Sequence, residues 1–103
     1  MERGPVVTGI SPVIEQLQDC RTDAERARWL LNIPTFTFYR EQTAIYRALR
    51  KAGFGRGEQL VDLEISALLT VRDRFGRLPA DVEDLLNAAR TFMETLARKG
   101  GVK

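Results

Sequence analysis

Residues 11–34 read SPVIEQLQDCRTDAERARWLLNIP, and this stretch carries the signals that decide the fold. Ser11 before Pro12 is typical of a helix start, in which a capping side chain is followed by a proline in the first turn. Thr22 and Glu25 have the spacing of a capping box, which satisfies backbone N–H groups at the start of a second helix. The proline that ends the stretch disfavours helical geometry before it, so we expect two short helices in succession.

Three further helices are expected after this stretch, because apolar residues continue at helical spacing. The third covers residues 37–51, the fourth covers residues 58–75, and the fifth covers residues 79–99. Gly76 has the position of a left-handed residue that closes the fourth helix. Three alternate glycines are expected to interrupt the helices before the fourth one: Gly53, Gly55 and Gly57.

The predicted fold class is therefore all-α, a compact bundle of about five short-to-medium helices joined by short connections. The chain has 103 residues, which is close to the common size of one domain. We expect residues 10–100 to form a single helical domain. Residues 1–9 are expected to be a flexible N-terminal lead, and residues 101–103 a tail.

Composition limits the chemistry that the chain can carry out. It has 16 Lys and Arg, 14 Asp and Glu, and no histidine, which is the commonest general base and metal ligand. The one cysteine, Cys20, has no disulfide partner within the chain and favours a reducing compartment. No apolar run approaches the ~20 residues of a membrane span, and no signal peptide is evident. We therefore expect a non-enzymatic cytoplasmic protein without a metal or a cofactor.

Two acidic clusters are the remaining candidates for acid–base chemistry. Both lie in or near the first turns of expected helices, where the helix dipole stabilises negative charge, so a structural role is expected. The two clusters consist of Glu58, Asp62 and Glu64, and of Asp81, Glu83 and Asp84.

The helix expected over residues 37–51 carries the most informative surface. On a helical wheel Phe38, Ile45 and Leu49 share one face, which we expect to enter the core. Tyrosine and arginine, which are enriched in interaction hot spots, lie beside and opposite that face. A solvated basic face with tyrosines at the core edge is the other interpretation of this pattern. The predicted partner-binding residues are Tyr39, Arg40, Thr43, Tyr46, Arg47, Arg50 and Lys51.

The last helix carries a narrow apolar stripe formed by Leu85, Ala89, Phe92 and Leu96. Such a stripe is typical of a helix that pairs with a second copy of the chain. An ordinary bundle core has the same pattern, so a homodimer and a monomer both fit the sequence.

Residues 30–40, LLNIPTFTFYR, resemble the turn and early recognition helix of prokaryotic helix-turn-helix regulators. In that family a glycine occupies the turn, and Asn32 takes its place here. The resemblance implies a DNA-binding transcriptional regulator in which the helix around residues 37–51 enters the major groove. The residues that it would present to bases and phosphates are Thr35, Thr37, Tyr39, Arg40, Thr43 and Arg47.

The first functional prediction is a small regulator or adaptor that acts by binding another macromolecule, with a protein as the preferred partner. A host regulator and an inhibitor from a phage or mobile element both fit this prediction. The alternative is the helix-turn-helix regulator, whose partner is nucleic acid.

Overall fold

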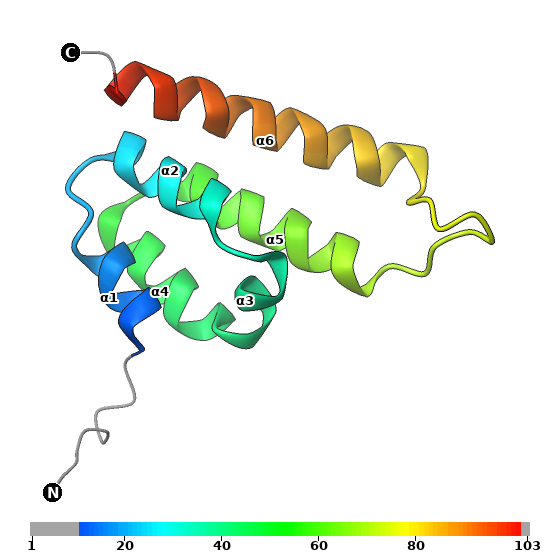
Figure 1. The fold of residues 1–103 in the computed structure, drawn as a ribbon, viewed down its shortest axis with the longest axis horizontal. Helices are drawn as coiled ribbons and strands as arrows, with labels where there is room; N and C mark the ends of the chain where they lie inside the picture. The colour runs from blue at the N-terminus through cyan, green and yellow to red at the C-terminus, as the bar shows by residue number, and fades with distance from the viewer. Residues whose placement is uncertain (1–10, 102–103) are drawn as a thin grey trace, which may run out of the picture.

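The computed structural model describes residues 11–101, and this part of the chain forms six α-helices and no strand (Figure 1). The predicted all-α class is confirmed. The expected lead, residues 1–9, lies outside the described residues, and of the expected tail only Gly101 is described, as the last residue of a helix. The helices are α1 (Pro12–Gln18), α2 (Asp23–Asn32), α3 (Thr35–Arg40), α4 (Gln42–Ala52), α5 (Gly55–Leu69) and α6 (Ala80–Gly101).

Both predicted helix starts in the first stretch are confirmed. The Ser11 side chain accepts a hydrogen bond from the Ile14 N–H at 3.3 Å at the start of α1. The Thr22 side chain accepts from the Glu25 N–H at 3.1 Å at the start of α2. The Glu25 carboxylate in turn accepts from the Arg21 N–H at 2.6 Å, and this hydrogen bond is the main cause that lowers the pKa of Glu25.

The helix α5 lies at the centre of the bundle and contacts α2, α3, α4 and α6. The long helix α6 runs antiparallel to α2 and α5 and covers one side of them (Figure 1). On the other side α1 packs against α4 and α3 packs against α4 and α5. No helix within residues 11–101 is both long enough and apolar enough to cross a membrane.

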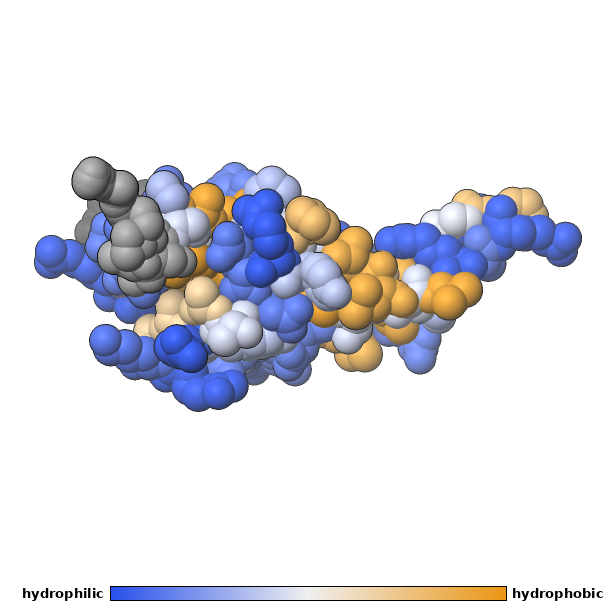
Figure 2. All heavy atoms as spheres, turned by 90° about the horizontal axis from the view of Figure 1, so that it is seen from below, coloured by the Kyte–Doolittle hydropathy of each residue, from blue (hydrophilic) through white to orange (hydrophobic). Residues whose placement is uncertain are grey.

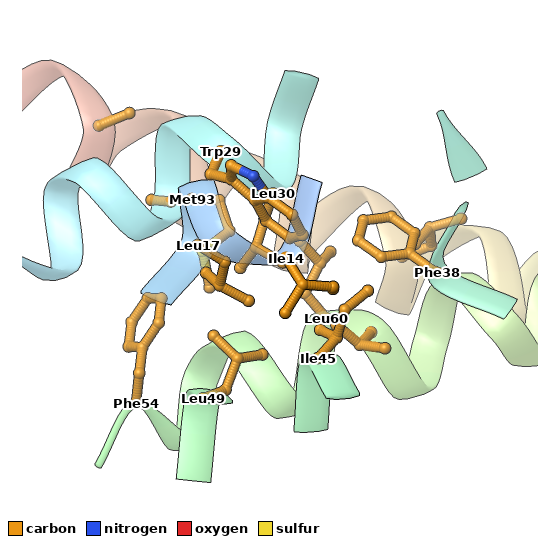
Figure 3. Close-up of a cluster of buried hydrophobic side chains, with 14 of the residues drawn as sticks. Ile14, Leu17, Trp29, Leu30, Phe38, Ile45, Leu49, Phe54, Leu60 and Met93 are labelled. Carbon is orange, nitrogen blue, oxygen red and sulfur yellow. The ribbon is translucent and has the colours of Figure 1, made fainter. Parts of the chain in front are cut away.

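All six helices contribute side chains to one core, as does Phe54 between α4 and α5 (Figure 3). Phe38, Ile45 and Leu49 are each at most 2% exposed, so the face predicted from the helical wheel is confirmed. The only tryptophan, Trp29, is buried in the same cluster. The six helices therefore share a single hydrophobic centre.

The single helix predicted over residues 37–51 is wrong, because two helices meet at Glu41. Glu41 has φ −108° and ψ 21°, which is outside the α-helical range and interrupts the helix. Phe38 on α3 and Ile45 on α4 enter the same core on either side of the interruption, and α4 also packs against α1. Thr37, the first residue of the predicted helix, is instead buried within α3.

The helix predicted over residues 58–75 is also displaced. It begins at Gly55 and ends at Leu69. Val71 and Phe75, which lie within the predicted range, are 88% and 73% exposed in the connection to α6. We call this connection, residues 70–79, the arm. It projects beyond the ends of α5 and α6 (Figure 1).

Only one of the three alternate glycines ends a helix. Gly53 has φ 73°, and its N–H donates to the Arg50 carbonyl at 3.0 Å to close α4. The expectation that Gly55 and Gly57 also interrupt helices is wrong, since both lie in the first turn of α5. A Cβ atom at Gly57 would lie 2.7 Å from the Phe54 ring, so glycine allows a close approach there.

Candidate functional site

Five of the seven predicted partner-binding residues come together on α4. They line a groove between α4 and α5, and two carboxylates of α5 line its other side. The α4 residues are Thr43, Tyr46, Arg47, Arg50 and Lys51, and the carboxylates are those of Glu58 and Asp62. The tertiary structure therefore places acidic groups beside a surface that is basic in sequence.

The two carboxylates make direct contacts with α4. Arg50 Nη2 donates to Glu58 Oε1 at 3.0 Å, and the Tyr46 hydroxyl donates to Asp62 Oδ1. Burial raises the pKa of Tyr46, and the hydrogen bond to Asp62 raises it further. Within residues 11–101, Arg47 and Lys51 form no ion pair. The positive charge of the groove is thus partly neutralised by Glu58 and Asp62 of the same chain.

The other two predicted residues, Tyr39 and Arg40, lie on α3, beyond the interruption at Glu41. Tyr39 is 42% exposed. Arg40 lies with its guanidinium 5.9 Å from the ring centre of Phe36 and its Nε 3.5 Å from a Glu41 carboxylate oxygen. These two residues therefore belong to the surface around Phe36 and are separate from the α4 groove.

The segment that resembles a helix-turn-helix has a different geometry from the implied one. Asn32, expected in the turn, is the last residue of α2. Thr37, expected to face DNA, is 6% exposed. In addition α2 packs against α1, α5 and α6, whereas α3 packs against α4 and α5. The two helices of the expected motif therefore do not pack against each other.

The residues of the predicted self-association stripe are divided between core and surface. Ala89 and Leu96 are partly buried and pack against the core. Leu85 is 59% exposed, and Phe92 is 38% exposed with the Arg56 guanidinium 4.5 Å from its ring centre. Ala89 and Leu96 thus pack into the core of this chain, whereas Leu85 and Phe92 remain exposed.

Large apolar side chains are exposed where α3, the end of α5 and the arm meet, a region that the sequence analysis missed. Phe36 and Leu69 are 59% and 63% exposed. Figure 2 shows apolar residues gathered between the body of the protein and the projecting arm. Exposed apolar patches of this kind are typical of interaction sites. We define the terminal apolar surface as Phe36, Leu68, Leu69, Val71 and Phe75.

The arm is a closed turn built around Asp73. The Asp73 carboxylate accepts from the N–H groups of Phe75 and Arg77 at 2.8 and 2.9 Å. The backbone N–H of Asp73 donates to the Arg77 carbonyl at 3.0 Å, and the Gly76 N–H donates to the Asp73 carbonyl at 2.9 Å. Gly76 has φ 79°, so its predicted left-handed conformation is confirmed, although it closes a turn and no helix. Aspartate at the first and glycine at the fourth position is a turn signal that the sequence did contain.

Three arginines surround the apolar residues of the arm. The guanidinium carbons of Arg74 and Arg77 lie 5.5 and 6.0 Å from the ring centre of Phe75. Arg72 donates to the Gly76 carbonyl at 3.3 Å. The ion pairs of the described residues involve arginines elsewhere in the fold and none of these three. The arm therefore combines exposed apolar groups with guanidiniums that pair with no carboxylate of residues 11–101.

A hollow lies at the base of the arm, between α3, α5 and α6. Half of its eight lining residues are apolar, and its one carboxylate, that of Glu64, is held by Arg90 through hydrogen bonds of 2.7 and 2.8 Å. The hollow joins α3 to the base of the arm and so lies beside the terminal apolar surface. The lining residues are Thr35, Glu64, Ala67, Leu68, Arg72, Leu78, Leu86 and Arg90.

Comparisons of the chain with profiles of protein families, with curated proteins and with solved structures find no match.

Proposed function

We propose that this protein is a small helical adaptor or regulator that binds a partner protein through the terminal apolar surface and the arm. The observation that carries the proposal is the exposure of five large apolar side chains at one end of a small bundle. Apolar groups in contact with water are unfavourable unless a partner covers them. Arginine beside apolar and aromatic groups is also a frequent composition of protein interfaces.

The internal hydrogen bonding of the arm supports the same proposal. Hydrogen bonds around Asp73 link residues 72–77 into a closed turn. A segment that is ordered before binding loses less conformational entropy when a partner docks. The arm is therefore suited to present Val71 and Phe75 to another molecule.

Two of the residues predicted from the sequence fit this surface. Tyr39 and Arg40 lie on α3 with Phe36, so they extend the proposed interface along that helix. The groove on α4 is a weaker candidate, because Glu58 and Asp62 already contact its Arg50 and Tyr46.

A photo-crosslinking amino acid in place of Leu69 tests the proposal in the native cells of the protein. Leu85 is the matched control, because it is also an exposed leucine near one end of a helix, 59% exposed against 63%. We expect a discrete adduct with another protein from position 69 and no adduct with that same protein from position 85. The adducted protein, once purified, should bind the wild-type chain and lose binding to Leu69→Asp. Equal adducts at both positions, or a purified protein that binds Leu69→Asp normally, would contradict the proposal.

The alternative function, DNA binding, is tested with labelled duplex DNA. If α3 and α4 contact phosphates, the fluorescence anisotropy should report binding that weakens steeply with salt. Neutralising Arg40, Arg47 and Lys51 should then flatten that salt dependence. We expect no such binding. If it is detected, DNA binding replaces the adaptor role as the proposed function.

A further inference from the structure

We infer that the terminal apolar surface and the arm bind an acidic amphipathic helix of the partner protein. This inference rests on the proposed function and specifies the chemistry of the partner. It follows from the positive charge of the arm, from the hydrogen bonding of its backbone and from the hollow at its base.

Charge around the apolar surface is positive and lacks a counter-charge in direct contact. Arg72, Arg74 and Arg77 are exposed and form no ion pair with the described residues. Asp73, the one acid of the arm, has its carboxylate held by two backbone N–H groups. Glu83 at the start of α6 lies near Arg72 and Arg77 without pairing with them. A partner that complements this surface must carry carboxylates beside apolar groups.

Most backbone groups of the turn in the arm are already hydrogen-bonded within it. From Asp73 to Arg77, the N–H and carbonyl groups are engaged within the turn except for both groups of Arg74 and the carbonyl of Phe75. The turn therefore offers few backbone groups to a partner, and a segment that binds through side chains has to satisfy its own backbone hydrogen bonds. A helix does so, and an amphipathic helix can place one apolar face on such a surface.

The hollow at the base of the arm supplies a place for an apolar anchor. Leu68 and Leu78 line it, and Arg72 lines the same site. Leucine or phenylalanine from the partner helix would bury against these leucines. A carboxylate near the anchor would then lie close to Arg72.

A nucleic acid matches the surface less well. Its phosphates would satisfy the arginines but would leave Leu69 and Val71 exposed to water. Bases could stack on Phe75, but two guanidiniums already lie against that ring. The observations therefore favour an acidic protein segment.

The first experiment uses the full chain and a labelled synthetic peptide of about five helical turns. The peptide carries leucines at i, i+3, i+4 and i+7 spacing and glutamates on its other face. A peptide with the same residues in scrambled order tests the need for an amphipathic helix. A peptide with lysine in place of glutamate tests the charge, and labelled duplex DNA tests the nucleic acid.

We expect the acidic helical peptide to bind best, and increasing salt to weaken it. Leu69→Asp, and separately the double variant R74E/R77E, should each weaken binding by about tenfold or more, as loss of an interface anchor does. Leu85→Asp should bind as the wild type does. Circular dichroism should show native helix content for all variants, since the changed side chains are exposed.

Several outcomes would overturn the inference. They are equal binding of the scrambled or the lysine peptide, no binding of the acidic peptide, and binding of DNA that R74E/R77E abolishes but Leu69→Asp does not.

A second measurement distinguishes failure of this inference from failure of the proposed function. The partner segment crosslinked to position 69 is sequenced, and it should be acidic with apolar residues at helical spacing. A specific adduct through a basic or non-amphipathic segment would overturn the inference and leave the proposed function standing. The absence of any specific adduct would overturn both.

Discussion

The guanidinium of Arg90 on α6 holds the carboxylate of Glu64 on α5 through two hydrogen bonds, from Nε to Oε2 at 2.7 Å and from Nη2 to Oε1 at 2.8 Å. The side chain of Glu64 is 7% exposed, whereas that of Arg90 is 43% exposed. The hydrogen bond with Glu64 also raises the pKa of Arg90. The pair links α5 and α6, the two longest helices. Because Glu64 is buried and Arg90 is partly exposed, the carboxylate depends on the guanidinium more than the guanidinium depends on the carboxylate.

Replacing Arg90 should cost more stability than replacing Glu64. Arg90→Ala leaves a buried carboxylate without its partner, which should lower the free energy of unfolding by about 2–4 kcal/mol. Glu64→Leu leaves a guanidinium that can turn toward water, and we expect a loss under about 1 kcal/mol. Urea unfolding of both variants measures the difference. Equal losses would show that the carboxylate is not the more dependent partner.

Gly57→Ala should destabilise the protein although alanine favours helices. The added Cβ would meet the Phe54 ring at 2.7 Å and Leu30 Cδ1 at 3.2 Å, and Phe54 is buried. We expect a loss of about 1–3 kcal/mol from this overpacking. Gly55→Ala is the matched control, because no atom lies within 4 Å of its added Cβ. The control should be neutral or stabilising by up to about 1 kcal/mol. Thermal unfolding followed by Trp29 fluorescence measures both, and equal effects would contradict the proposed packing.

Asp73→Ala should loosen the arm without unfolding the bundle. The change leaves the N–H groups of Phe75 and Arg77 without their acceptor. Trypsin cleaves after arginine, so cleavage within residues 72–77 should become several-fold faster while the melting temperature changes little. Asp84→Ala, which removes an exposed carboxylate of α6, should leave the cleavage rate unchanged. An unchanged rate in Asp73→Ala would mean that the carboxylate does not hold the turn.

Stability should fall at alkaline pH because of Tyr46. Its raised pKa arises from burial, from the hydrogen bond to Asp62 and from the charges of Asp62 and Glu58. The fold therefore favours the neutral phenol. This stabilisation is complete below the ordinary tyrosine pKa of about 10 and is lost as the pH rises through the higher folded-state value.

Urea unfolding at increasing pH should show this loss in the wild type and a shallower loss in Tyr46→Phe. In Tyr39→Phe the remaining tyrosine is Tyr46. Ultraviolet absorbance of that variant should report ionisation above the ordinary range in the folded protein and within it in urea. Ionisation at the same pH in both states would contradict the Tyr46–Asp62 contact.

Part of the candidate site could be predicted from the sequence. The helical wheel correctly placed Phe38, Ile45 and Leu49 in the core, because a 3.6-residue period survives a short interruption at Glu41. The same wheel grouped Tyr46 and Arg50 as an exposed flank, but it could not include the carboxylates of α5 that contact them. Contacts between helices depend on how the helices pack, which a single-helix pattern does not contain.

The arm was missed for a different reason. Val71 and Phe75 continue the spacing of the apolar residues on α5, so periodicity extended the helix over them. Asp73 and Gly76 favour a turn, and they therefore indicated that the helix ends before them. Periodicity cannot distinguish a buried apolar residue from an exposed one, and here the chain leaves the helix at Thr70.

The sequence by itself determined the helical class, the starts of α1 and α2 and the residues of the α4 core face, because caps and apolar spacing are local properties of the chain. Tertiary structure alone decided the interruption at Glu41, the pairing of Glu64 with Arg90 and the exposure of the terminal apolar surface. These features depend on residues that are distant in sequence, and only the packing of α5 against its neighbours brings those residues together or leaves them uncovered.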